Sequence, residues 1–599
     1  MRWARPAAAC VSVVLAAVLS ACGGLATDSQ VQQGSQVGEA VQPVRVQPDG
    51  PETGAKPDQI VRGFLRAGAG AGFDDDHAIA RSFFAPNVKD QWLPDSGVEV
   101  YSDESALKVE ILTPTTVRVT VPIVAEVDDV GRYRQTPPGT SAQATFGMRK
   151  LQVGWRISVP QKGFGLWLSA RDLDRIYRPF NIAYVSKSAR TIVGDPRWFP
   201  ITTGLATTLA RAQLAPPPAY LSGAVQTGVP MGTVLAVDAV PIQSGRALVD
   251  LSAAALAADP DQRRAMWAQF VTTLMQVPSV TQISMTVEGA RLNLPGTPDG
   301  VSVLTTLGYP IDASVSAKAA FLRQDSQLSR VSPDRPQVQD QPRKALLPST
   351  SSTLPKIPQG WVSLAMSWSG QEIAGIGGDH ADLGRWQGNR MFQLARFGSS
   401  LTKPSYDSLN GLWVAGQSGG ASKVWVIDTS LSPVKDAKPR EISVPWLAKR
   451  TVVALRVASD NQRLALITSD LAGGDVQVVI AGIVRSASGV AVSLAPEPLR
   501  VGWTIIAATD LAWADDSTLA VLGRVDPKAA IAPQLVEIGG KVTALSPIDR
   551  TQAGHEHRRG QRGCGDYGSG QGPGSRGQRL AAAAERHRLP DSRRVDRQF

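Results

Sequence analysis

Cysteine is scarce in this chain of 599 residues, which contains Cys10, Cys22 and Cys564 and no other. None of them lies in the long body between residues 23 and 563. A disulfide framework of the kind that stabilises small secreted domains is therefore excluded for this body. Its length suggests three or more domains, each held together by packing alone.

Long hydrophobic runs are equally rare. The stretch that comes nearest to membrane length ends at Ala21 and covers about 15 residues, whereas a spanning helix needs roughly 20. Arg2 and Arg5 precede it, and small residues close it. This pattern predicts an export signal over residues 1–21 rather than a spanning helix.

The end of this signal carries the motif Leu19-Ser20-Ala21-Cys22, followed by two glycines. It matches a bacterial lipobox, in which the cysteine thiol receives a diacylglyceryl group and the new amino terminus is then acylated. We therefore predict S-diacylglycerol and N-palmitoyl attachment at Cys22. The alternative is an ordinary signal peptide with an incidental cysteine. Residues 22–55 have almost no large apolar side chains and are expected to form a disordered tether.

Histidine is also too scarce to support an obvious catalytic site. Two histidines, His77 and His380, lie outside the carboxyl-terminal tail, far apart in the sequence and without HExxH or paired metal spacing. No GxSxG elbow or phosphate-binding loop is present. We expect no catalytic residues, no metal and no cofactor. A hydrolase using His380 is a minor alternative, and Asp74-Asp75-Asp76 is read as a solvated helix start rather than a metal site.

Basic charge does not indicate nucleic-acid binding. The net charge is +10, and half of it comes from residues 551–599, where ten arginines face five acidic residues. The remaining excess is spread over 550 residues and forms no basic footprint.

Residues 56–170 read as an α+β, cone-like domain. Ile60, Val61, Phe64 and Leu65 have helical spacing, and a second helix is expected from Asp74 to Phe84. Strand patterns follow, most clearly TVRVTVPIVAEV at 116–127, where Val117, Val119 and Val121 stand at alternate positions. Two helices followed by a curved meander are the predicted arrangement.

Residues 171–300 alternate strands and helices, which is typical of an α/β domain. Strands are predicted at NIAYV, TVLAVDAVPI, RALVDLS and QISMTVEG, and a helix at LATTLARAQL. A second helix at 261–277 places Met266, Phe270 and Leu274 four residues apart. From about 315 to 360 the composition turns to Ser, Pro, Gln and charge, which suggests a loop or a connector.

Residues 315–549 contain a weak internal repeat of strand, polar turn and strand. Its four copies are VSLAMSWSGQEIAGIGG, KPSYDSLNGLWVAG, VVALRVASDNQRLALIT and TDLAWADDSTLAVLGR. The spacing is roughly 40 to 55 residues, which is typical of propeller blades. We predict an all-β propeller, incomplete at its end, with an irregular β-sandwich as the alternative.

The tail at 550–599 abandons this pattern. Its residues 551–599 contain no lysine and are rich in Arg, Gly and Ala. We interpret it as a frameshifted end of the reading frame; the alternative is a genuine basic, disordered arm.

Taken in order, these features resemble the LpqB family of actinobacterial lipoproteins. The resemblance rests on the LSAC box, on GWRIS and GFGLWLS, on the GerMN-like run from NIAYVSKSARTIVGDPRWFP to QISMTVEG, and on the repeat. It implies a GerMN domain and an LpqB-type propeller. It also implies a non-catalytic accessory regulator of an MtrB-like sensor kinase, anchored by lipid outside the cytoplasmic membrane and affecting cell-wall homeostasis and division. The alternative function is binding of a cell-envelope glycan or peptide.

Overall fold

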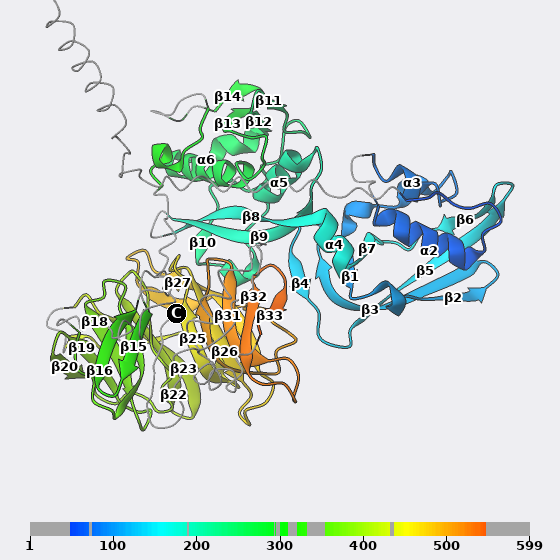
Figure 1. Cartoon of the computed structure of the whole chain (residues 1–599). Helices are drawn as coiled ribbons and strands as arrows, with labels where there is room; N and C mark the ends of the chain where they lie inside the picture. Colours follow the sequence, from blue (N-terminus) through cyan, green and yellow to red (C-terminus); the bar gives the residue numbers. More distant parts are fainter. Residues whose placement is uncertain are drawn as a thin grey trace, which may run out of the picture. The chain divides into compact units, whose positions relative to one another are not determined.

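Three consecutive regions of different secondary structure make up the chain in the computed structural model (Figure 1). The structure describes residues 48–70, 75–187, 191–292, 294, 300–309, 320–331, 354–431 and 436–546. All of them belong to one compact unit, residues 44–599. The predicted multidomain class is confirmed: an α+β region is followed by an α/β region and an all-β region.

The first region is a curved sheet covered on one face by a helix. Its main path has the order β6-β5-β3-β1-β7, and β2 and β4 also pair with β3. The elements are α2 (Pro57–Gly68), α3 (Ala78–Arg81), β1 (Val98–Tyr101), β2 (Lys108–Thr113), β3 (Thr116–Val127), β4 (Tyr133–Gln135), β5 (Ser141–Leu151), β6 (Gly154–Val159) and β7 (Leu166–Ser169).

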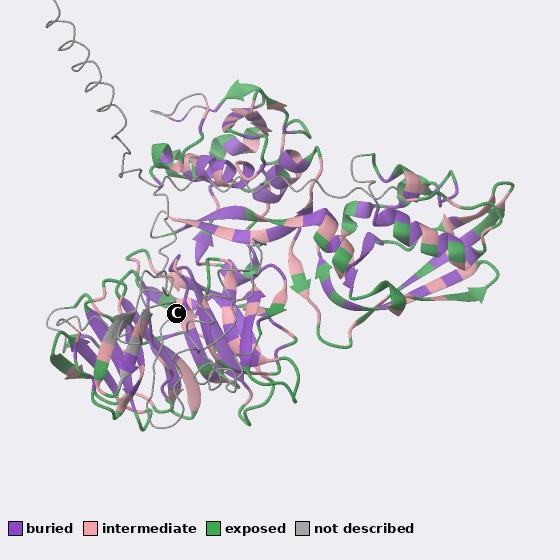
Figure 2. Ribbon diagram, in the orientation of Figure 1, coloured by how far each residue is buried: buried purple, intermediate pink, exposed green. Residues whose placement is uncertain are grey.

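The core of this region follows from the sequence periodicities. On α2 the predicted face is buried, and Phe64 packs edge-on against Phe84 and Trp92, with ring centroids 4.9 and 5.0 Å apart. Along β3 every second residue from Val117 onward is buried, and the residues between face outward (Figure 2). The alternation predicted from sequence is therefore confirmed.

Two expectations for this region are wrong. The helix expected from Asp74 to Phe84 has only four residues, because Asp76 and His77 adopt left-handed backbone with φ of 54° each and interrupt it. Asp74 lies outside the described residues. The sheet is also not a simple meander, since β7 pairs in parallel with β1.

The second region is built around a β-α-β unit. β12 and β13 are parallel neighbours, and α6 connects them. Asp259 caps α6 by accepting a hydrogen bond from the Gln262 N–H at 2.8 Å. The elements are α4 (Ala170–Ile176), β8 (Tyr177–Ser186), β9 (Ile192–Pro200), α5 (Leu205–Leu214), β10 (Val225–Gln226), β11 (Ile242–Gln243), β12 (Arg246–Leu251), α6 (Pro260–Leu274), β13 (Gln282–Val287) and β14 (Ala290–Arg291).

The predicted apolar stripe of α6 is confirmed, because Met266, Phe270 and Leu274 are fully buried. The strand predicted at TVLAVDAVPI is wrong. That segment is irregular, apart from an isolated bridge between Leu235 and Leu251 and the first residue of β11. The chain bends over residues 236–238, so that Val234 and Val237 are exposed, while Val240 and the partly buried Leu235 pack on the core of this region.

The third region contains four sheets that follow one another along the chain. Each copy of the sequence repeat forms the first two strands of one sheet, which supports propeller blades rather than a sandwich. The strands are β17 (Trp361–Met366), β18 (Glu372–Gly377), β19 (Leu383–Gln387) and β20 (Arg390–Gln393); β21 (Ser405–Tyr406), β22 (Gly411–Ser418), β23 (Ala421–Asp428) and β24 (Arg440–Ile442); β25 (Thr451–Val457), β26 (Arg463–Ser469), β27 (Gln477–Arg485), β28 (Ala491–Leu494) and β29 (Leu499–Val501); β30 (Ala507–Trp513), β31 (Thr518–Arg524), β32 (Ala532–Glu537) and β33 (Val542–Ala544).

A hairpin precedes these sheets inside the segment that the composition suggested to be a loop or connector. It consists of β15 (Ala320–Gln324) and β16 (Gln327–Val331). Phe321 and Leu328 pack with Trp361 and Trp386 of the first sheet. The loop-or-connector expectation is therefore wrong for residues 320–331, where two polar-looking strands still place apolar residues against the blade.

Candidate functional site

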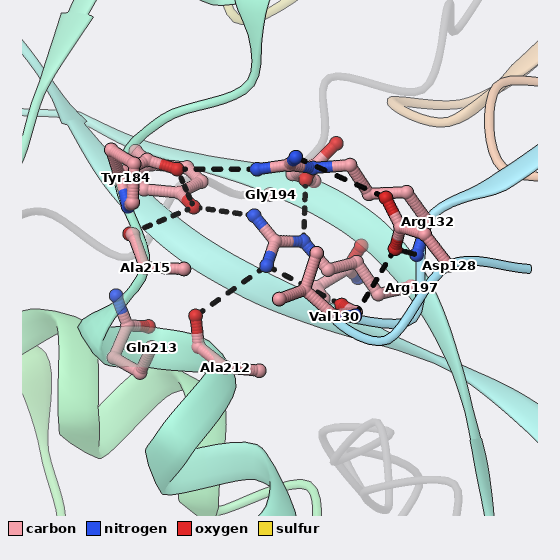
Figure 3. Close-up of polar contacts among 12 residues, drawn as sticks. Asp128, Val130, Arg132, Tyr184, Gly194, Arg197, Ala212, Gln213 and Ala215 are labelled. Carbon is pink, nitrogen blue, oxygen red and sulfur yellow. Dashed lines mark hydrogen bonds and ion pairs between the residues drawn. The ribbon is translucent and has the colours of Figure 1, made fainter. Parts of the chain in front are cut away.

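A buried arginine, Arg197 on β9, lies at the centre of a polar cluster to which the first and second regions contribute (Figure 3). Its Nε donates to Asp195 Oδ2 at 2.8 Å, and its Nη2 donates to the Tyr184 hydroxyl at 2.6 Å. Asp195 and Arg197 are two residues apart on one strand, so both side chains point to the same face. The Arg197 and Asp195 side chains are 0% and 6% exposed, which makes this a buried ion pair.

The loop after β3 contacts this cluster from the first region. Asp128 Oδ1 accepts hydrogen bonds from the backbone N–H groups of Val130 and Arg132, at 3.2 and 2.7 Å, and so shapes the turn. The turn then receives a hydrogen bond from the Trp198 backbone N–H to the Gly131 carbonyl at 2.7 Å. Arg197 Nη1 also reaches the Val130 carbonyl at 3.5 Å.

The propeller region contacts β9 next to Asp195. Arg463 on β26 donates from Nε to Asp460 Oδ2 at 2.7 Å and from Nη1 to the Gly194 carbonyl at 3.3 Å. The Tyr220 hydroxyl donates to Asp195 Oδ1 at 3.0 Å. Both oxygens of Asp195 are thus satisfied, and the second and third regions share one hydrophobic cluster around these polar groups.

The electrostatics of the cluster favour a structural role. Burial raises the pKa of Tyr184 to about 12, with a partly opposing effect of the Arg197 charge. Burial, followed by the charge of Asp195, raises the pKa of Tyr220 well above its usual value. Both tyrosines therefore stay neutral hydrogen-bond donors at physiological pH. A nucleophile or a general base needs the opposite pKa shift, so the two tyrosines act here as hydrogen-bonding groups of a buried polar cluster.

The residues predicted from the sequence to carry lipid do not lie in this cluster. Leu19, Ser20, Ala21 and Cys22 are outside the described residues, as are the signal over 1–21 and the tail over 550–599. Lipid attachment at Cys22 therefore stays a prediction. Within the described ranges, no helix combines the length and the apolar content needed to cross a membrane.

The two histidines of the body are not brought together with other catalytic groups. His77 is buried beside Trp92, with ring centroids 5.4 Å apart. His380 is exposed, and its Nδ1 lies 3.0 Å from the Leu401 carbonyl oxygen. In the part of the chain that the structure describes, no three His, Cys, Asp or Glu side chains are grouped to hold a metal ion.

Sequence reasoning did not identify the polar cluster. A signal for it was present in GDPRWFP, where Asp195 and Arg197 are charged residues at alternate positions of an otherwise apolar strand. Such residues are buried only when they are paired. Arg463 is a second buried, paired arginine. It begins the apolar strand β26, and its partner Asp460 lies three residues earlier in the preceding turn.

Models of three protein-domain families match consecutive parts of the chain. Residues 50–174 match "Lipoprotein LpqB, N-terminal domain", and residues 180–293 match "Sporulation and spore germination". Residues 345–552 match "Lipoprotein LpqB beta-propeller domain". Together these three matches cover most of the chain, and they follow one another in the same order as the three regions of the structure.

Two relatives that align along about nine-tenths of both chains are named Lipoprotein LpqB. Lipoprotein LpqB of Thermobifida fusca is 28% identical over 90% of this chain and 91% of its own length. Lipoprotein LpqB of Cutibacterium acnes is 26% identical, with 91% of each chain covered. Among solved structures, the first GerMN domain of GerM from Bacillus subtilis is 17% identical over 21% of this chain and 94% of that domain, with a TM-score of 0.18.

Proposed function

The chain belongs to the LpqB family of lipoproteins, and from this premise we propose that it is a non-catalytic accessory regulator of an MtrB-like sensor histidine kinase. In this proposal Cys22 carries the lipid, and the folded regions lie on the extracytoplasmic face of the cytoplasmic membrane. The regulated process is cell-wall homeostasis and division, and no cofactor is required.

The observation that carries the proposal is the domain order. The N-terminal, germination-type and propeller matches follow one another along this chain. Two LpqB-named relatives align with about nine-tenths of the chain and of their own length. A non-catalytic role is supported by the names of these relatives and domains, which denote lipoproteins and not an enzyme family.

The buried cluster around Arg197 gives this role a physical basis. A contact surface that spans several regions keeps its shape only if these regions hold together. Hydrogen bonds from buried arginines cross the region boundaries here, from Arg197 to the Val130 carbonyl and from Arg463 to the Gly194 carbonyl. These contacts support the proposal that the folded regions present one surface to a partner.

Lipid attachment at Cys22 is supported by the lipobox chemistry and by the family name. One acyl chain holds a protein only marginally at a membrane, whereas two or more anchor it stably. The diacylglyceryl group and the additional acyl chain that a mature lipoprotein receives meet this requirement. Residues 22–55 then supply the predicted tether.

A pull-down tests the proposed partner. The full-length lipoprotein, in detergent, is mixed with the extracytoplasmic part of an MtrB-like kinase, and a kinase ectodomain of an unrelated sensing system serves as the control. We expect selective retention of the MtrB-like ectodomain. Retention of neither ectodomain, with cell-wall glycan or muropeptide retained instead, contradicts the proposal.

A further inference from the structure

A cavity of about 350 Å³ opens on the sheet of the first region, and Asp128 and Arg132 of the turn that contacts the cluster around Arg197 lie at its border. Val98 and Val100 of β1, like Ala125 and Val127 of β3, point into the core that α2 covers. The residues between them, including Glu99 and Glu126, point to the opposite face, where the cavity lies. Its volume is in the range of sites for small ligands.

Four side chains form a row across this face. The strand registers place Trp167 of β7 beside Glu99 of β1, Glu99 opposite Glu126 of β3, and Glu126 opposite Arg134 of β4. Two like charges directly opposite each other destabilise a sheet. Arg134 does not relieve them, because its guanidinium pairs with Asp128 at 3.4 Å. Among the described residues, neither Glu99 nor Glu126 has an ion-pair partner within 4.0 Å.

The Glu99 carboxylate is held in an unfavourable position. Its Oε2 atom is buried and has no hydrogen-bond partner among the described residues. Burial, and then the charge of Glu126, raises the pKa of Glu99 to about 7. A buried carboxylate without a compensating group costs free energy, and a cation bound between the two glutamates would remove this cost.

The walls of the cavity indicate what kind of cation fits. Trp167 lines it next to the glutamates, whereas the Phe164 ring packs against Phe64 of α2. Arg132 and Arg134 also line the cavity, and both pair with Asp128. An indole accepts methylene groups and also a cation, so an ammonium group on a short aliphatic chain fits the two unpaired glutamates and the indole beside them.

We propose that this cavity binds the primary ammonium group of a ligand between the carboxylates of Glu99 and Glu126, with its aliphatic chain against Trp167. The ligand is either a free amine or a lysyl side chain of a short peptide. The inference goes beyond the proposed function, since the cavity lies within one region and can be occupied whether or not a kinase is contacted.

Calorimetric titration of the full-length lipoprotein in detergent at pH 8 tests this proposal. The probes are 1,5-diaminopentane and acetyl-Gly-Lys-Gly-amide, with norleucine in place of lysine as the uncharged peptide. We expect saturable binding of at least one amine probe and none of the norleucine peptide. Preference for the first probe identifies a free amine, and preference for the second identifies a peptide.

Matched variants assign the binding to the row. Glu99→Gln and Glu126→Gln should each lower the affinity for the amine probe by at least about ten-fold, or about 1.4 kcal/mol. Glu110→Gln changes an exposed glutamate of β2, outside the cavity lining, and should leave affinity unchanged. The thermal unfolding midpoint of each variant shows whether it is folded. Failure of both amine probes to bind, or equal affinity of folded Glu99→Gln and wild type, overturns the proposal.

Discussion

At the scale of single residues, the buried ion pair of Arg197 and Asp195 and the unpaired oxygen of Glu99 represent opposite situations. Arg197 finds partners for its guanidinium on β8, on β9 and in the loop after β3. Glu99 Oε2 has none among the described residues. The first arrangement supports the fold and the second weakens it, so their substitutions should have effects of opposite sign.

Replacing Arg197 by Ala should cost about 3–5 kcal/mol of unfolding free energy, because Asp195 is left buried without its cation. Urea unfolding of the full chain measures this. The matched control is Arg211→Ala, whose ion pair with Asp238 is largely exposed and should contribute about 0–1 kcal/mol. Equal losses in the two variants would show that the Arg197 pair does not stabilise the domain junction.

Glu99→Gln should stabilise the protein at pH 8 and not at pH 4. The folded state raises the pKa of Glu99 from its ordinary 4.5 to about 7. The folded state therefore holds the proton more tightly, and wild-type stability falls as the pH rises from about 4.5 to about 7. Glutamine does not titrate and escapes this loss, which we expect to be on the order of 1 kcal/mol after solvent screening.

The measurement is urea unfolding of wild type and Glu99→Gln at both pH values, with Glu110→Gln as the reference. A gain for Glu99→Gln that is equal at pH 4 and pH 8 would show that it does not come from the titration of this carboxylate.

At the scale of elements, the turn between β3 and β4 joins the first region to β9. Gly131 has φ of 80°, and a Cβ atom there would lie 2.6 Å from the Phe199 ring and 2.9 Å from the Trp198 carbonyl oxygen. The position therefore requires glycine both for its backbone conformation and for its space.

Gly131→Ala should lose more stability than Gly139→Ala, and the difference measures the contact with β9. Gly139 has a similar φ of 88°, but a Cβ atom there would meet nothing within 4 Å. The shared left-handed conformation costs about 1–2 kcal/mol in each variant. Crowding against Phe199 should add about 1–3 kcal/mol to Gly131→Ala. Thermal unfolding of both variants measures their losses of stability. Identical losses would mean that the turn rearranges around the added methyl group without crowding Phe199.

Elements with a strong period could be predicted from the sequence. The α2 and α6 stripes, the alternation of β3 and the four repeats all have their core residues at the expected spacing. Elements whose conformation depends on distant partners could not be predicted. TVLAVDAVPI has the alternation of a strand but bends over residues 236–238, and the β15–β16 hairpin has a polar composition but packs on Trp361.

The cluster around Arg197 was beyond sequence reasoning for the same reason. Asp195 and Arg197 are close in sequence, but Tyr184, Tyr220 and the loop carbonyl of Val130 reach them only through the tertiary fold. The strand registers that bring Glu99 beside Trp167 include a parallel pairing of β1 with β7, which local patterns do not reveal.

At the scale of the whole molecule, the proposed lipid at Cys22 would determine where the folded regions act. Cys22→Ala should abolish incorporation of labelled palmitate and leave the chain uncleaved or mislocalised, because the modification requires the thiol. Metabolic labelling and membrane fractionation measure this, and Cys10→Ala, within the signal, is the matched control. Normal processing and stable membrane attachment of Cys22→Ala would contradict the lipobox assignment.

The central claim is that the anchored protein contacts an MtrB-like sensor kinase. Its most direct test is crosslinking in intact cells, followed by identification of the trapped protein by mass spectrometry, with wild type and Cys22→Ala compared at equal expression. We expect the kinase to be the dominant crosslinked protein for wild type and its yield to fall sharply for Cys22→Ala. Crosslinks to cell-wall material or to other proteins, with none to the kinase, would contradict it.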